Sequence, residues 1–113
     1  MDAELKARWV EALRSGKYKQ GIGQLKTRSG KYCCLGVLCA IQGIDLDTHP
    51  STGEYGRYGD FSFPEYIHAP GLDDTAAEYD DSYRAVLASM NDSKEKPFPE
   101  IADWIEKNIP ATA

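Results

Sequence analysis

The sequence lacks the features that would place the protein in a membrane or assign it a standard catalytic mechanism. No apolar run approaches the ~18 residues that a membrane-spanning helix needs, and the N-terminal stretch is charged throughout, unlike a signal peptide. Neither a Gly-x-Ser-x-Gly nor a His-Glu-x-x-His motif occurs. These absences predict a cytoplasmic protein without a membrane partner, and they give an enzymatic function no positive support.

Cysteine and histidine are scarce. The three cysteines, Cys33, Cys34 and Cys39, are packed too closely for a disulfide framework or for the paired knuckles of a structural zinc site. We therefore expect reduced cysteines that are buried as small apolar side chains, with no metal and no cofactor. The two histidines, His49 and His68, both lie in an irregular region.

Positive charge is also in short supply, since 13 Lys and Arg stand against 18 Asp and Glu, a net charge of −5. This argues against generic nucleic-acid binding, which needs a surplus of cations to displace counterions. The charge is uneven along the chain. Residues 1–41 carry eight basic and three acidic side chains, a net of +5, which leaves −10 for residues 42–113. Such asymmetry is informative about partners rather than about the fold.

Four segments have the apolar spacing that is typical of helices with a buried face. The second segment is apolar nearly all round, so we place it at the centre of the core. The segments are residues 2–15, 33–42, 75–91 and 98–109. The side chains that we expect to be buried are Trp9, Leu13, Leu35, Leu38, Val86, Leu87, Ile101 and Ile105.

A β-hairpin is predicted over residues 24–33, because Ser29-Gly30 is suited to a two-residue turn between short alternating segments. Residues 43–74 are irregular and rich in glycine, proline and aromatic side chains. We therefore expect a single α+β domain over residues 1–113. Three to four helices would surround the central helix, with the small hairpin at one edge.

Acidic and tyrosine side chains gather around the start of the third helical segment. Such a cluster is commonly a solvated helix start, because acids stabilise a helix N-terminus. It is also suited to docking on a basic partner, since complementary charge steers association and tyrosine is enriched at interfaces. The predicted partner-binding residues are Asp73, Asp74, Glu78, Tyr79, Asp80, Asp81 and Tyr83.

A second candidate site lies in the basic, glycine-rich segment over residues 17–31. Exposed backbone N–H groups with nearby cations can cradle a nucleotide or another anion. The segment lacks the Gly-Lys-Ser/Thr of a P-loop and the third glycine of a dinucleotide fingerprint, so turn glycines with a solvated basic rim remain the alternative. The candidate residues are Lys17, Lys19, Gly21, Gly23, Lys26, Arg28 and Lys31.

A third candidate is the alternating set Asp45, Asp47 and His49, which places three potential metal ligands on one side of an extended segment. It does not match a calcium-binding EF-hand loop, because Pro50 stands where that loop needs glycine and the closing Glu is missing. A metal-dependent enzyme around these residues is one reading, and solvated loop acids are the other.

Two blocks of the sequence resemble a known family. The first runs from Trp9 to Gly21 and continues as Tyr32–Cys39 (YCCLGVLC), and the second runs from Met90 to Glu106 (MND, then F, IAD and IE). Both resemble a family of small uncharacterised proteins of tailed phages and prophages. The resemblance implies a phage or prophage source and a cytoplasmic setting in an infected bacterium. It carries over no catalytic residue.

These observations predict a non-enzymatic, phage-type accessory protein that binds a host protein. Interference with a host defence system is the most concrete version of this hypothesis. The alternative function is binding or sequestration of a small anionic ligand by residues 17–31, and the third is the metal-dependent enzyme around Asp45, Asp47 and His49.

Overall fold

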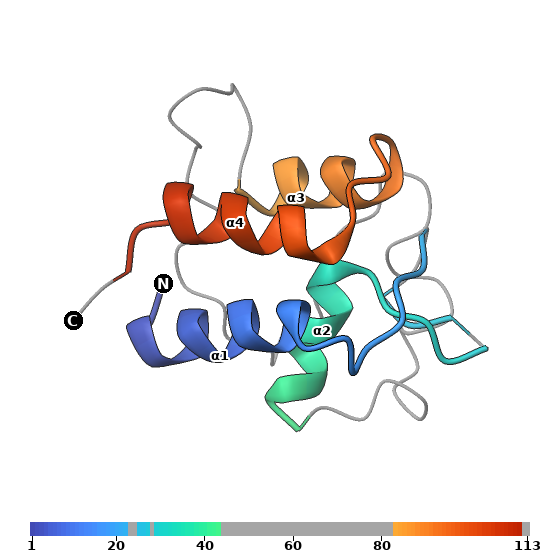
Figure 1. The fold of residues 1–113 in the computed structure, drawn as a ribbon, viewed down its shortest axis with the longest axis horizontal. Helices are drawn as coiled ribbons and strands as arrows, with labels where there is room; N and C mark the ends of the chain where they lie inside the picture. The colour runs from blue at the N-terminus through green and yellow to red at the C-terminus, as the bar shows by residue number, and fades with distance from the viewer. Residues whose placement is uncertain (23–24, 28, 44–82, 112–113) are drawn as a thin grey trace.

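The computed structural model describes residues 1–22, 25–27, 29–43 and 83–111. Four helices lie within these ranges, and they correspond to the four predicted helical segments (Figure 1). Residues 75–82, the first part of the third predicted segment, lie outside the described residues. The helices are α1 (Ala3–Arg14), α2 (Cys34–Ile41), α3 (Tyr83–Asp92) and α4 (Phe98–Asn108).

Helix α1 begins and ends where its sequence predicts. The Asp2 carboxylate caps the first turn by accepting a hydrogen bond from the Leu5 backbone N–H at 2.8 Å. After the helix, Gly16 adopts a φ of +76°, a left-handed conformation that glycine reaches without steric cost. The buried face of α1 consists of Trp9, Val10 and Leu13.

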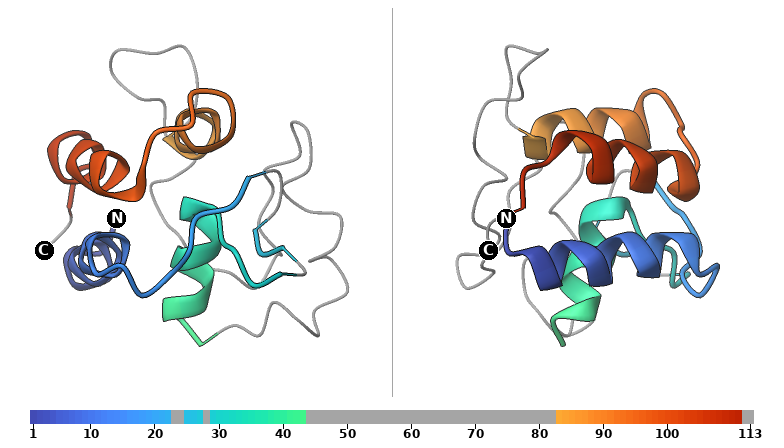
Figure 2. Two further views of the ribbon diagram at one scale, coloured as in Figure 1. Left: turned by 45° about the vertical axis from the view of Figure 1, so that its right-hand side comes forward. Right: turned by 60° about the vertical axis from the view of Figure 1, so that its left-hand side comes forward.

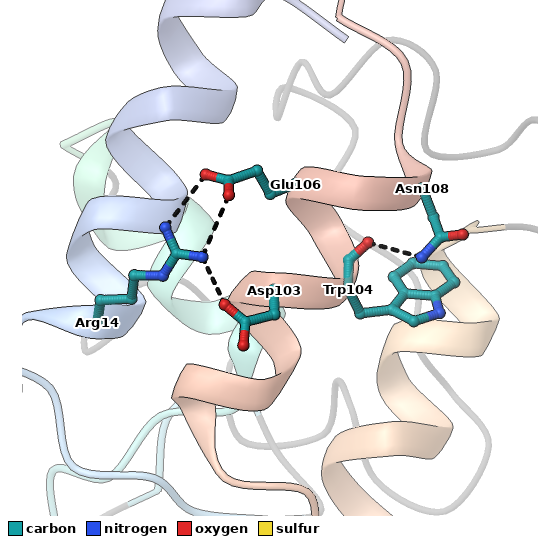
Figure 3. A network of polar contacts seen from close by, with 5 residues as sticks. All are labelled: Arg14, Asp103, Trp104, Glu106 and Asn108. Carbon is teal, nitrogen blue, oxygen red and sulfur yellow. Dashed lines mark hydrogen bonds and ion pairs between the residues drawn. The ribbon is translucent and has the colours of Figure 1, made fainter.

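Helices α1 and α4 lie side by side and run in opposite directions (Figures 1 and 2). The Lys6 ammonium donates to the backbone oxygens of Glu106 at 3.1 Å and Ile109 at 2.6 Å, so it satisfies carbonyls at the C-terminal end of α4. Arg14 forms ion pairs with Asp103 and Glu106 across the same pair of helices (Figure 3). Because these ion pairs are exposed, they orient the helices more than they stabilise them.

Helix α2 lies at the centre of the core, with the consecutive residues from Cys34 to Cys39 all buried. It contacts α1 and α3, and the Trp9 indole N–H donates to the Cys34 backbone oxygen at 2.9 Å. The Arg8 guanidinium donates to the Ile41 oxygen at 2.6 Å and so caps the other end of α2. The eight side chains predicted to form the core are all buried, which confirms that expectation.

The predicted α+β class and its hairpin over residues 24–33 are wrong. No strand forms among the described residues, where the pairing consists of isolated bridges from Tyr32 to Lys26 (antiparallel) and to Gln20 (parallel). The turn itself exists, because Gly30 has a φ of +86° and its N–H donates to the Thr27 oxygen at 3.0 Å. The second arm is too short for a strand, because Cys33 is already the N-cap of α2. The described part of the chain is therefore helical.

Candidate functional site

The predicted acidic docking residues lie outside the described residues, with one exception. Tyr83 is described, and it is 7% exposed at the start of α3. Its ring packs edge-on against Trp104 of α4, with centroids 6.2 Å apart. Tyr83 is thus a core residue rather than part of an exposed docking surface. The residues outside the described ranges are Asp73, Asp74, Glu78, Tyr79, Asp80 and Asp81.

The candidate metal ligands Asp45, Asp47 and His49 also lie outside the described residues. Within the described ranges, no group of three or more histidine, cysteine, aspartate and glutamate side chains is placed to hold a metal ion.

The three cysteines are free and buried, as expected for core residues. Burial raises the pKa of Cys33 and of Cys39 from the ordinary 9.0 to about 12, and it raises the pKa of Cys34 well above 9.0. Cys33 also has a local role, because its sulfur accepts a hydrogen bond from the Gly36 N–H at 3.3 Å as the cap of α2. At neutral pH the thiols are protonated, so they are poor nucleophiles.

The basic segment folds into a surface built on two tyrosines. The rings of Tyr18 and Tyr32 meet edge to face, with centroids 5.2 Å apart. The Lys17 ammonium lies 6.0 Å from the centroid of Tyr18, and the Lys26 ammonium lies 5.5 Å from that of Tyr32, within the range of cation–π attraction. We call the set formed by Lys17, Tyr18, Lys19, Lys26, Lys31 and Tyr32 the basic tyrosine surface.

Backbone hydrogen bonds hold this surface together around Tyr32. The Tyr32 N–H donates to the Lys19 oxygen at 2.8 Å, and the Tyr32 oxygen accepts from the Gly21 N–H at 2.7 Å. On the other side of the turn, the Thr27 N–H donates to the Lys31 oxygen at 2.7 Å. Three stretches of chain that carry lysines are therefore neighbours in space.

The lysines of this surface differ in exposure. Lys17, Lys19 and Lys31 are exposed, and Lys26 is half-buried. Among the described residues, no carboxylate forms an ion pair with Lys17, Lys19 or Lys31. The surface therefore presents positive charge that the described part of the fold does not neutralise.

The described half of the predicted backbone cradle for an anion is already hydrogen-bonded within the fold. The Gly21 N–H is engaged by the Tyr32 oxygen and so does not point at a ligand, while Gly23 and Arg28 lie outside the described residues. Gly21 is packed tightly, because a Cβ built there would lie 2.7 Å from the Lys31 Cβ. Its role is close packing, and the side-chain ammonium groups carry the positive charge.

Gln20 and Asn91, which are not among the predicted site residues, fix this surface to the helices. The Gln20 side-chain N–H₂ donates to the Asn91 side-chain oxygen at 2.9 Å and to the Lys96 backbone oxygen at 2.7 Å. Its own carbonyl oxygen accepts from the Phe98 N–H at 3.1 Å, at the start of α4. The sequence does contain a signal for Asn91. It follows Leu87 by four residues, so it is a polar residue on the apolar face of α3.

An open groove of about 590 Å³ runs along α1. Among the described residues, no histidine or cysteine lines the groove. The hydroxyl of Ser15, which does line it, donates to the Ala12 backbone oxygen at 2.7 Å. The groove therefore has no nucleophile paired with a base. Its lining consists of Ala3, Lys6, Ala7, Val10, Glu11, Arg14, Ser15 and Glu106.

Comparison with known proteins yields a family and no described activity. None of the helices in the described ranges has the length and apolar character to cross a bilayer. No curated protein and no solved structure gives a significant match to the chain. A family model described as "Domain of unknown function (DUF8296)" matches residues 1–63. Because this match covers more than half of the 113 residues, the chain belongs to the DUF8296 family.

Proposed function

We propose that this protein is a non-enzymatic binding protein that takes an anionic partner on the basic tyrosine surface. The observation that carries the proposal is the set of exposed ammonium groups on Lys17, Lys19 and Lys31, for which no carboxylate of the described residues serves as a counterion. Hydrogen bonds through Tyr32 keep these groups on neighbouring stretches of backbone. A preformed cluster of like charge attracts an oppositely charged partner and speeds its association.

The chemistry of the surface supports binding over catalysis. Ammonium groups attract an anion, and both they and tyrosine hydroxyls can donate hydrogen bonds to it. The nearby thiols Cys33 and Cys34 are buried and protonated, so they do not supply a nucleophile to this surface.

The biological setting is part of the proposal. The resemblance of the Tyr32–Cys39 segment to small proteins of tailed phages and prophages supports an accessory role in the bacterial cytoplasm. The partner would then be a host component, and interference with host defence would be the consequence of binding it. The acidic residues from Asp73 to Asp81 remain a predicted second docking surface.

Two charge-matched double variants test the binding surface. Lys17→Glu with Lys31→Glu reverses charge on the basic tyrosine surface, and Lys94→Glu with Lys107→Glu makes the same change on exposed residues elsewhere. We expect the first variant to elute from immobilised heparin, a generic polyanion, at clearly lower salt than the second, with both retaining the wild-type melting temperature. Equal elution of the two variants would show that the attraction comes from overall charge and not from this surface.

A further inference from the structure

We infer that the anionic partner is an acidic protein segment that also presents an apolar side chain, and that this side chain packs on Ile22. The inference rests on the proposed binding function and specifies the chemistry of the partner. It draws on three observations: the exposure of Ile22 next to Gly21, the edge-to-face contact of the two tyrosine rings, and the hydrogen bond that the Gly21 N–H already makes.

Ile22 is 52% exposed and is the exposed large hydrophobic side chain of the described residues. A single exposed apolar residue is ordinary, so its position is what matters. It directly follows Gly21, which packs against the Cβ of Lys31 and the methyl group of Thr27. An apolar contact with a rim of charged groups is the usual composition of a protein–protein interface.

The tyrosine rings are poorly placed to stack on nucleic-acid bases. Proteins that bind single strands use aromatic side chains with open faces as stacking platforms. Here Tyr18 and Tyr32 are half-buried and contact each other edge to face. A lysine ammonium already lies over each ring. The tyrosines therefore act as supports for the lysines.

The polar groups of the surface suit carboxylates better than a phosphate cradle. A phosphate site typically gathers several backbone N–H groups, and the Gly21 N–H is committed to the Tyr32 oxygen. The overall charge of −5 further opposes a long polyanion, because duplex DNA carries a charge about every 1.7 Å. A short acidic segment needs only a few ammonium partners and gains additional contact area from Ile22.

Three fluorescent probes distinguish the possibilities. The first is a set of short peptides with four carboxylates, in which a leucine occupies each position in turn. The second is the same set with serine in place of leucine, and the third is a single-stranded oligothymidylate of the same charge. We expect the best leucine peptide to bind at least about fivefold more tightly than its serine counterpart and than the oligonucleotide, measured by anisotropy; fivefold corresponds to about 1 kcal/mol.

Variants of Ile22 locate the apolar contact. Ile22→Ser is expected to bind the leucine and serine peptides equally, whereas Ile22→Val retains most of the difference. Because Ile22 is half-exposed, both variants are expected to fold. Equal binding of the two peptide sets by the wild type, or a difference that survives Ile22→Ser, would overturn the contact with Ile22.

The outcomes distinguish a wrong partner class from a wrong binding surface. If the oligonucleotide binds at least as tightly as every peptide, and Lys17→Glu with Lys31→Glu weakens that binding, the acidic-protein partner is wrong while the anion-binding surface stands. If no probe loses affinity in the double lysine variant relative to the Lys94→Glu with Lys107→Glu control, both proposals fail.

Discussion

The side-chain amide of Asn91, at the end of α3, donates a hydrogen bond at 2.9 Å to the backbone oxygen of Gly21, which lies 70 residues earlier in the chain. Asn91 is fully buried, and its side-chain oxygen accepts from the Cys34 N–H at 3.2 Å and from Gln20 at 2.9 Å. One side chain thereby joins the basic tyrosine surface, the start of α2 and the end of α3.

The first prediction concerns this link. Asn91→Leu keeps the size of the side chain but leaves the Gly21 oxygen and the Cys34 N–H without a partner. Because an unpaired buried polar group costs about 1–3 kcal/mol, we expect the free energy of unfolding to fall by about 2–4 kcal/mol. Urea denaturation monitored by tryptophan fluorescence measures it.

A neighbouring residue provides the control for Asn91. Asp92→Asn retains an acceptor for the Asn91 amide, which donates to Asp92 at 2.8 Å, and it is expected to change stability by less than about 0.5 kcal/mol. A similarly small effect of Asn91→Leu would contradict the assignment of Asn91 as the link between these elements.

The second prediction concerns Gly36 in the first turn of α2. In an ordinary helix, Gly→Ala stabilises by up to about 1 kcal/mol. Here a Cβ on Gly36 would overlap the backbone oxygen of Leu25, which packs directly on the helix. We therefore expect Gly36→Ala to destabilise by about 1–3 kcal/mol. A higher denaturation midpoint for Gly36→Ala would mean that the Leu25 backbone does not contact α2 this closely in solution.

The third prediction concerns the centre of the core. Leu38 is fully buried in α2, and Leu38→Ala is expected to cost about 2–5 kcal/mol, the usual range for truncation of a buried leucine. Ile22→Ala removes a comparable side chain from an exposed position and serves as the control, with a change of less than about 0.5 kcal/mol. Similar losses for both variants would be inconsistent with α2 as the central helix.

The fourth prediction concerns pH. Burial raises the pKa of Cys33 and Cys39 to about 12, so the folded protein keeps these thiols protonated where unfolded thiols, with an ordinary pKa of 9.0, ionise. The unfolded state then binds fewer protons, and stability falls as pH rises. The stability that depends on keeping these two thiols protonated is fully present below about pH 9 and is lost between about pH 9 and pH 12.

Two measurements check the behaviour of the thiols. Each buried thiol adds at most about 1.4 kcal/mol per pH unit to the loss of stability above pH 9, and Cys39→Ala should remove one such share from the slope. At pH 8 the native protein should resist alkylation, whereas three thiols should react after unfolding. Rapid labelling of a native thiol at pH 8 would argue against its burial.

The helical segments were predictable because their information is local. In α1, Trp9 and Leu13 are four residues apart and share the buried face, and Asp2 and Gly16 mark its ends. In α2, a nearly continuous apolar run followed by Gly43 was sufficient to indicate a buried helix. Such patterns depend on periodicity and on turn chemistry, both of which can be read along the chain.

The basic segment shows where local reasoning fails. Its turn residues predict a hairpin. In the structure, Tyr32 forms an antiparallel bridge with Lys26, as a hairpin would, but it also forms a parallel bridge with Gln20, which precedes the predicted hairpin. Cys33 ends the extended stretch because it caps α2. The competition between a second strand and a helix start was settled by the burial of α2 in the core, a tertiary effect that overrides the local preference for a strand.

The sequence by itself determined the positions of the helices, the identity of the core side chains and the placement of positive charge in the first part of the chain. Tertiary structure alone decided that the Gly21 amide serves the fold rather than a ligand, and that Tyr83 packs inside against Trp104. It also decided that Gln20 and Asn91 hold the basic tyrosine surface. The reason is that a buried polar group must find a partner, and that partner can lie anywhere in the chain.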